Sequence, residues 1–360
     1  MANDPFCAKK EEIKKMQKLQ YIIKRIVLAL ITGFIIISLT FILLKLIPGE
    51  KPLGIESQMV AFYENQVKLG YYFDSKVAID GMTLQWKYTD STAVTHYYYA
   101  RPVMEQYFNW LSNVFTRFDW GTSSSIEKGT QVIYVISSRL PTTVAINAIT
   151  IVIAIPIGVA IGILAALKKN KPTDRVISIT SMILISIPSF VFVSLLIMVF
   201  GYLTGWLPTR WPQSGEPLAN QVKGYIIPVL AGLFGYICSY QRIVRGELTE
   251  VMASDFLLLA RTKGLTRTQT VTHHALRNAM VPVLPSILAS IVGILSGSAI
   301  LESIYSIPGI GNLFVQAINQ KDYNVLMLDM SVFTAIGLLS GIVLDLSYGF
   351  LDPRIRMGER

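Results

Sequence analysis

The sequence is poor in charge, cysteine and histidine. Asp, Glu, Lys and Arg make up only 15% of its 360 residues, against about 25% in an average globular domain, while 52% are hydrophobic. Two cysteines, Cys7 and Cys238, are too few for a disulfide framework or a thiolate metal site. The histidines, His96, His273 and His274, do not stand near cysteines or acids at a metal-ligand spacing. This composition argues against a soluble enzyme, a disulfide-rich domain and a disordered chain.

The hydrophobic residues gather in segments long enough to cross a bilayer as helices, which needs roughly 20 apolar residues. In Ile26–Leu44, fourteen residues are Leu, Ile, Phe or Val and none is charged. At about −0.3 to −0.6 kcal/mol each, they favour insertion by roughly 4 to 8 kcal/mol. We interpret this segment as a retained span rather than a cleaved signal peptide. The predicted spans are Ile26–Ile47, Pro141–Leu167, Val176–Phe200, Tyr225–Gln241, Val281–Leu301 and Leu326–Tyr348. The sequence therefore predicts an all-α polytopic membrane protein with six transmembrane helices.

The four middle segments contain no Asp, Glu, Lys, Arg or His, and the chain has no Gly-x-x-x-x-Gly-Lys-Ser/Thr phosphate-binding loop. A carrier driven by protons or sodium ions needs polar or ionisable sites near the middle of the bilayer. An intramembrane enzyme needs its nucleophile, base or metal ligands inside the membrane. We therefore expect no catalytic residue, cofactor or metal site in this chain, and an energy source in another protein.

Lys and Arg are concentrated on one predicted side of the membrane. Twenty of the 32 lie in the two terminal tails and in loops 168–175 and 242–280, whereas eleven lie in segments 48–140, 201–224 and 302–325. Because basic residues in short loops favour the cytoplasm, loop 168–175 carries most weight. Both termini are predicted to be cytoplasmic. These loops account for the net charge of +9, so we expect no nucleic-acid partner.

The predicted spans divide the chain into segments. These are a cytoplasmic N-terminal tail (1–25), a first transmembrane helix (26–47), an extracellular domain (48–140), a five-helix transmembrane core (141–350) that includes loop 246–280, and a cytoplasmic C-terminal tail (351–360). The core is rich in Pro and Gly, and Gly158 and Gly162 have the spacing that permits close helix contact. This pattern suits a bundle that rocks between states, and it equally suits ordinary membrane packing.

The longest predicted cytoplasmic loop contains signals for two short helices. Asp255 can cap a helix over Phe256–Lys263, which Gly264 can end in a left-handed turn. Thr266 can cap a second helix over Arg267–Ala279. A compact projection of this kind suits docking on a partner protein. The alternative is a solvated basic face beside anionic lipid.

This loop and several other blocks resemble the permease subunits of ABC importers. The similarity is greatest to the B-type permease of the dipeptide, oligopeptide and nickel branch. The matching blocks are Asp255…Ala260-Arg-Thr-Lys-Gly264-Leu…His274-Ala-Leu-Arg-Asn278…Pro282, Glu302–Gly311, Asp322-Tyr323, Leu351–Arg356, Leu46–Gly49, Phe118–Ser123 and Arg139–Thr143. Their order and spacing cover nearly the whole chain.

The resemblance implies that the chain is not an enzyme but half of a translocation path in the bacterial plasma membrane. It implies a second homologous permease subunit, two cytoplasmic ATPase subunits that bind ATP and Mg, and an extracellular solute-binding protein. Peptides are the expected substrate. Nickel or metal chelates, opines and sugars are alternatives within the same class. A stand-alone secondary carrier, and a membrane scaffold or sensor that docks ATPases without transport, are alternatives outside it.

The resemblance also implies which residues form the coupling helix. Ala260 and Gly264 match the positions that enter the ATPase cleft. The implied docking residues are Asp255, Phe256, Leu259, Ala260, Arg261, Lys263 and Gly264. The family motif begins Glu-Ala-Ala, whereas Leu258 and Leu259 stand at the first two positions here. The usual acidic contact is therefore missing at position 258.

The predicted extracellular segment departs from the family by about 30 extra residues between Leu69-Gly70 and Gln106–Trp110. It contains Asp80-Gly81, a signature of tight hairpins, and residues 51–128 hold sixteen aromatic side chains. We predict a small mixed α/β domain with a hairpin. It could cap the entrance or receive the binding protein, or it could be a structural elaboration at the membrane surface whose aromatic side chains form its own core.

Overall fold

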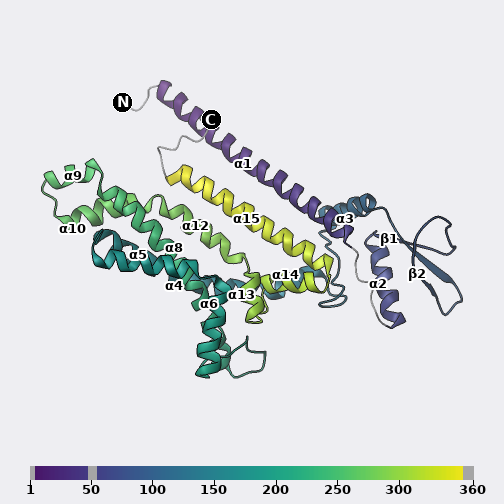
Figure 1. The fold of residues 1–360 in the computed structure, drawn as a ribbon. Helices are drawn as coiled ribbons and strands as arrows, with labels where there is room; N and C mark the ends of the chain where they lie inside the picture. The colour runs from purple at the N-terminus through teal and green to yellow at the C-terminus, as the bar shows by residue number, and fades with distance from the viewer. Residues whose placement is uncertain (1–4, 48–54, 352–360) are drawn as a thin grey trace. The chain divides into compact units, whose positions relative to one another are not determined.

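The computed structural model describes residues 5–47 and 55–351, and most of them are helical (Figure 1). The chain divides into two compact units. Unit 1 comprises Met1–Ile31, Arg139–Asn312 and Ala335–Arg360, and unit 2 comprises Thr32–Ser138 and Leu313–Thr334. Apart from Leu351, the predicted C-terminal tail lies outside the described residues, as do residues 1–4 of the N-terminal tail and 48–54 of the predicted extracellular domain.

Long helices dominate both units. The four longest are α1 (Pro5–Leu46), α4 (Val132–Leu167), α8 (Ile226–Met252) and α15 (Tyr323–Leu351). The shorter helices are α2 (Glu56–Lys68), α3 (Val103–Arg117), α5 (Pro172–Ser186), α6 (Ser189–Leu196), α7 (Leu218–Gly224), α9 (Asp255–Thr262), α10 (Arg267–Gln269), α11 (Leu276–Met280), α12 (Val283–Val292), α13 (Ala299–Ile304) and α14 (Ile310–Asn319). Two π-helical segments, η1 (Ile197–Leu203) and η2 (Thr270–Ala275), and a 3₁₀ turn, η3 (Gly293–Leu295), continue some of them.

Five helical stretches in the described chain are long and apolar enough to cross a membrane, and a bent pair adds a sixth if it counts as one span. The five are Leu19–Leu46, Val132–Leu167, Leu218–Met252, Val283–Ile304 and Tyr323–Ser347. Each overlaps one of the predicted spans. The prediction of a helical polytopic membrane protein is confirmed.

The third predicted span, Val176–Phe200, is not one continuous helix. It is broken between α5 and α6, whose axes differ by 94° across the break. Pro188 explains the break, because proline lacks an N–H donor and disfavours helical torsions in the residue before it. Ile187 accordingly leaves the helical region, with φ −79° and ψ 119°.

In unit 1, the Gly158 and Gly162 pair brings α4 against α8. A Cβ on Gly158 would lie 2.8 Å from Cβ of Tyr240 and 2.9 Å from the carbonyl oxygen of Ile237. A Cβ on Gly162 would lie 2.8 Å from the carbonyl oxygen of Gln241. The two helices therefore approach so closely that neither position accepts a larger side chain without a shift of the backbone.

Unit 2 contains an antiparallel three-stranded sheet in the order β1-β3-β2. Its strands are β1 (Tyr72–Ser75), β2 (Leu84–Thr89) and β3 (Thr95–Ala100). The hairpin predicted at Asp80-Gly81 is wrong, because this dipeptide lies in the connection between β1 and β2, which do not pair. The hairpin joins β2 to β3 instead. Oδ1 of Asp90 accepts hydrogen bonds from the backbone N–H groups of Thr92 and Val94, both at 2.9 Å, and this side-chain turn reverses the chain.

The two ends of this sheet insertion lie next to each other. Nδ2 of Asn109 donates to the carbonyl oxygen of Gly70 at 2.8 Å, and Nδ2 of Asn113 donates to that of Leu69 at 3.3 Å. The N–H of Arg101 donates to the carbonyl oxygen of Tyr71 at 2.9 Å. The segments that flank the sheet, Leu69–Tyr71 and Arg101–Asn113, are therefore in direct contact.

Aromatic side chains form the core of unit 2. Phe41 on α1 is buried and stacks on Trp110 of α3, with ring centroids 4.9 Å apart. A second cluster joins α2 to the sheet, where Tyr63 stacks on Trp86 at 5.0 Å. Each such pair contributes about 0.5–1.5 kcal/mol beyond the burial of its area.

One ionic contact in this sheet makes its stability depend on pH. Nδ1 of His96 on β3 lies 2.6 Å from Oδ2 of Asp74 on β1, and Nε2 lies 3.8 Å from Oδ2 of Asp90. The hydrogen bond to Asp74 raises the pKa of His96 above its ordinary value of 6.5. Because protonation is favoured in the folded state, this stabilisation is complete below the unfolded pKa and disappears as pH rises through the folded pKa.

We therefore expect the β1 and β3 amides to lose protection from hydrogen exchange between about pH 5.5 and about pH 8.5, after correction for the intrinsic exchange rate. Mass spectrometry of the full chain in detergent measures this change. In His96→Gln the difference between the two pH values should shrink. An unchanged difference in that variant would assign the pH dependence to another group.

Candidate functional site

The predicted docking residues lie on and just after α9. Figure 1 shows α9 and α10 at one end of unit 1, beyond the ends of α5 and α8. Ser254 holds the N-cap position and Asp255 is the first helical residue, so the predicted cap at Asp255 is wrong by one residue. The predicted end is confirmed: Lys263 is the C-cap, and Gly264 has φ +89°, a torsion that favours glycine.

The α9 helix has one buried and one exposed side. Leu257 is 4% exposed and packs in a cluster of small and apolar residues from α4, α8, η2 and α11, namely Ala166, Leu248, Ala275 and Ala279. The neighbouring Phe256, Leu258 and Leu259 are 43%, 63% and 57% exposed. Leu257 therefore attaches α9 to the rest of unit 1, while three large apolar side chains face outward. Ala260 is partly buried, and the other predicted docking residues, Asp255, Arg261, Lys263 and Gly264, are exposed.

The second predicted helix begins where the sequence places it. The Thr266 hydroxyl accepts from the N–H of Gln269, and the Gln269 side chain accepts from the N–H of Thr266, so the two residues form a capping box. The helical path then continues through α10, η2 and α11. Its central segment is π-helical, which the sequence does not predict.

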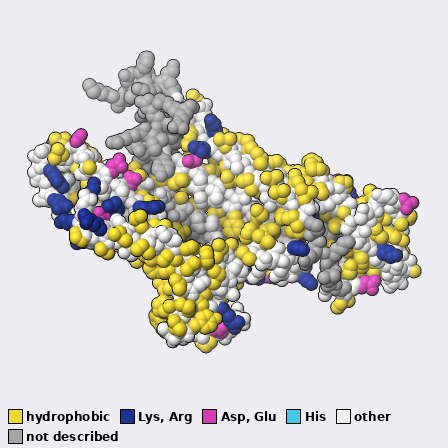
Figure 2. Space-filling model, in the orientation of Figure 1, with side chains coloured by type: hydrophobic (Ala, Val, Ile, Leu, Met, Phe, Trp, Pro, Cys, Tyr) yellow, Lys and Arg dark blue, Asp and Glu magenta, His cyan; other side chains and the backbone are white. Residues whose placement is uncertain are grey.

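Basic side chains surround this end of unit 1. Figure 2 shows Lys and Arg gathered near α9 and α10, and Arg261, Lys263 and Arg267 are exposed. Nη2 of Arg267 donates to the carbonyl oxygen of Leu167 at 3.4 Å, which links α10 to the end of α4. The surface thus combines exposed apolar residues with positive charge, a combination that suits a protein partner with an acidic rim.

A partly buried ion pair fixes the base of this projection. Nε and Nη2 of Arg245 on α8 lie 2.5 Å and 2.8 Å from Oδ1 and Oδ2 of Asp174 on α5. The N–H of Asn170 also donates to Oδ2 of Asp174 at 2.9 Å, and Asp174 is 1% exposed. This bidentate pair holds loop 168–175 to α8 just before α9. We did not predict it, although Asp174 is the one acid in that basic loop.

A second buried carboxylate joins two of the motif blocks. Glu302 on α13 is 3% exposed; Oε1 accepts from the Thr143 hydroxyl at 3.0 Å and Oε2 accepts from the N–H of Asn312 at 3.0 Å. The same hydroxyl accepts from the N–H of Ile310 at 3.1 Å. A Cβ on Gly309 would clash with the Glu302 carboxylate.

These carboxylates lie just outside the predicted spans. Asp174 precedes Val176 and Glu302 follows Leu301, although both fall within the longer candidate stretches Pro172–Ser186 plus Ser189–Leu203 and Val283–Ile304. Their charges are tolerated because donors from other segments replace water.

In unit 2, Asp322 joins another pair of motif blocks. Its Oδ2 accepts from the Ser123 hydroxyl at 2.5 Å and from the N–H groups of Ser124, Ser125 and Ile126 at 3.0, 3.0 and 3.2 Å. The Phe118–Ser123 block therefore folds around the residue that precedes α15. Motif blocks separated by more than a hundred residues thus meet in space.

Residues 158–357, more than half of the chain, match the family described as binding-protein-dependent transport system inner membrane component. The chain belongs to this family. Its members are transport components rather than enzymes, and the predicted resemblance is confirmed.

Individual relatives of this family match nearly the whole length of the chain. The oligopeptide transport system permease protein OppB of Haemophilus influenzae is 30% identical over 338 residues, which cover 94% of this chain and 99% of the relative. The dipeptide transport system permease protein DppB of Lactococcus lactis is 32% identical over 339 residues, with the same coverage. A solved amino acid ABC transporter chain shows 18% identity and a TM-score of 0.47 over 61% of this chain and 94% of its own, a likeness on which we base no argument.

The Asp174–Arg245 ion pair gives a direct test of how the α9 projection is held. Arg245→Ala leaves the buried Asp174 carboxylate without its counter-charge. Because the Arg245 side chain is 32% exposed, water can replace part of the lost contact, and we expect unit 1 to be destabilised by about 1–3 kcal/mol. Thermal unfolding in detergent measures the loss. Asp174→Ala combined with Arg245→Ala should recover much of the stability, because no uncompensated charge remains. Additive losses in the double variant would show that the pair is not coupled.

Proposed function

We propose that this chain is the membrane-spanning permease subunit of an ATP-driven importer for short peptides. The main support is its similarity to oligopeptide and dipeptide permeases, which covers 94% of this chain and 99% of theirs. Among the substrate alternatives, these relatives favour peptides over nickel chelates, opines and sugars. The chain forms one half of the path, and a second homologous permease subunit completes it.

We further propose that both termini and α9 face the cytoplasm, and that the described part of segment 48–140 lies outside the cell. The uneven distribution of Lys and Arg supports this orientation. The segments then keep their predicted order: tail 1–25, helix 26–47, external domain 48–140, core 141–350 and tail 351–360. An extracellular solute-binding protein delivers peptide on the side of the external domain.

In this proposal, α9 is the coupling helix and docks on one of two ATPase subunits. Phe256, Leu259 and Ala260 supply its apolar contact, and Arg261 and Lys263 contact acidic groups on the partner. ATP and Mg bind to the ATPase subunits, and this chain contributes no cofactor. Leu257 packs in one cluster with Ala166 of α4 and Leu248 of α8. A displacement of α9 is therefore passed directly to these two long helices of unit 1.

Leu259→Glu tests the docking proposal. Burying a leucine contributes about 1.5–3 kcal/mol, and an unpaired carboxylate in its place adds a further cost. We expect at least a tenfold loss of ATPase subunit recovered with the tagged chain, and a similar loss of tripeptide uptake by cells. Val77→Glu is the matched control, because Val77 is 71% exposed and lies in unit 2.

Uptake and ATPase recovery should be normal in the control. If Leu259→Glu retains both while the chain reaches the membrane at normal levels, α9 is not the docking helix. If the wild-type chain retains its ATPase partners but the cells take up no peptide, the docking holds and the substrate assignment fails.

A further inference from the structure

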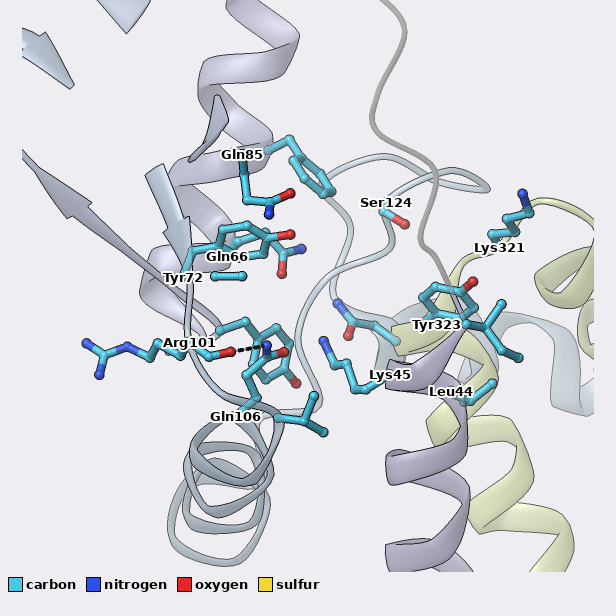
Figure 3. A pocket seen from close by; sticks show the side chains of 16 residues that line it. Leu44, Lys45, Gln66, Tyr72, Gln85, Arg101, Gln106, Ser124, Lys321 and Tyr323 are labelled. Carbon is cyan, nitrogen blue, oxygen red and sulfur yellow. Dashed lines mark hydrogen bonds between the residues drawn. The ribbon is translucent and has the colours of Figure 1, made fainter. Parts of the chain in front are cut away.

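Unit 2 contains a polar cavity that has no part in the proposed function described above. Its volume is about 320 Å³, at the lower end of the range for small-molecule sites. The end of α1, helices α2 and α3, the sheet and the segment before α15 all contribute to its wall. Figure 3 shows the side chains that line it.

Lys45 places a positive charge in this cavity. Its Nζ lies 3.6 Å from the centre of the Tyr71 ring and 5.6 Å from that of Phe41. Among the residues that the structure describes, no Asp or Glu forms an ion pair with Lys45. Ring faces compensate an ammonium only partly, so an anion that enters the cavity gains a direct electrostatic contact.

Two nearly buried amides lie in the same wall. Gln66 is 9% exposed and Gln106 is 7% exposed. Nε2 of Gln106 donates to the carbonyl oxygen of Arg101 at 2.8 Å, and the side chain of Gln66 has no hydrogen-bond partner among the described residues. In Figure 3 the Gln66 amide and the Lys45 ammonium extend into the same space. The Gln66 amide therefore offers a donor and an acceptor to a bound molecule.

The other basic residues in the wall do not add to this charge. Figure 3 shows the Arg101 guanidinium and the Lys321 ammonium extending away from the space that Lys45 enters. Nη1 of Arg101 is paired with Oε1 of Glu105 at 3.2 Å. The cavity thus combines a single cation with amide groups and tyrosine rings, which matches a single carboxylate attached to a peptide group.

We propose that this cavity binds the C-terminal carboxylate of a short peptide, with Lys45 as its counter-charge and Gln66 bonded to the last peptide group. This proposal rests on the proposed function as a peptide importer and adds a recognition site on the external domain. A lipid phosphate also carries a negative charge. It has no N–H to donate to the Gln66 carbonyl oxygen, however, whereas a peptide does.

Direct binding tests the proposal without the binding protein, which could itself select for a free carboxylate. The purified importer complex is placed in phosphatidylcholine nanodiscs, and binding of labelled trialanine is compared with that of trialanine amide by equilibrium dialysis. A charged hydrogen bond contributes enough that we expect roughly tenfold weaker binding of the amide. Lys45→Met should weaken trialanine binding by the same factor and leave the amide unchanged, while Lys45→Arg should retain part of the preference.

Lys87→Met is the matched control, because Lys87 is exposed on β2 and does not line the cavity. Gln66→Leu provides a second variant if Lys45→Met does not assemble, and it should weaken both peptides. Equal binding of the two peptides to the wild type, or trialanine binding that neither Lys45→Met nor Gln66→Leu alters, would overturn the proposal.

Two further results separate the possible failures. Phosphatidylglycerol that binds the wild type but not Lys45→Met, with no binding of trialanine, would assign the cavity to lipid phosphate and overturn the proposal. Uptake of trialanine by the complete importer is measured in parallel. Normal uptake with no binding at the cavity would refute this site alone, whereas absent uptake would refute the proposed function.

Discussion

The structure depends on one constraint: a carboxylate removed from water must receive hydrogen bonds from the protein. Asp174, Glu302 and Asp322 are all nearly inaccessible to solvent, and each accepts at least one hydrogen bond from a distant part of the chain. Glu302 accepts from a residue 159 positions away, and Asp322 from one 199 positions away. Since each carboxylate is costly without its donors, these contacts specify which segments of the long apolar helices lie together.

The same constraint bears on how the proposed importer works. The Asp174–Arg245 pair and the packing of Leu257 attach the exposed α9 helix to α5 and α8. Close contact at Gly158 and Gly162 joins α8 to α4 in turn. A force applied to α9 by a partner would therefore move several helices together rather than unwind a loop.

Local signals in the sequence predicted much of this architecture. Apolar run length located the spans, and Thr266 and Gly264 marked helix ends. The predictions from sequence fail where two local signals favour different structures, or where a contact with a distant segment decides the structure. The side chain of Asp90 forms the hairpin turn in place of Asp80-Gly81, and Pro188 bends a segment whose hydropathy is continuous. Thr143 and Arg245, which donate to Glu302 and Asp174, lie in segments that no local pattern connects to these carboxylates.

Side-specific labelling tests the central claim, that α9 and the sheet of unit 2 lie on opposite sides of the membrane. Single cysteines replace Leu259 or Val77 in a chain whose Cys7 and Cys238 are changed to serine, and intact cells are treated with a membrane-impermeant maleimide. The account predicts that the maleimide labels position 77 in intact cells. It predicts that position 259 is labelled only after the membrane has been permeabilised. Labelling of both positions from the same side would contradict it.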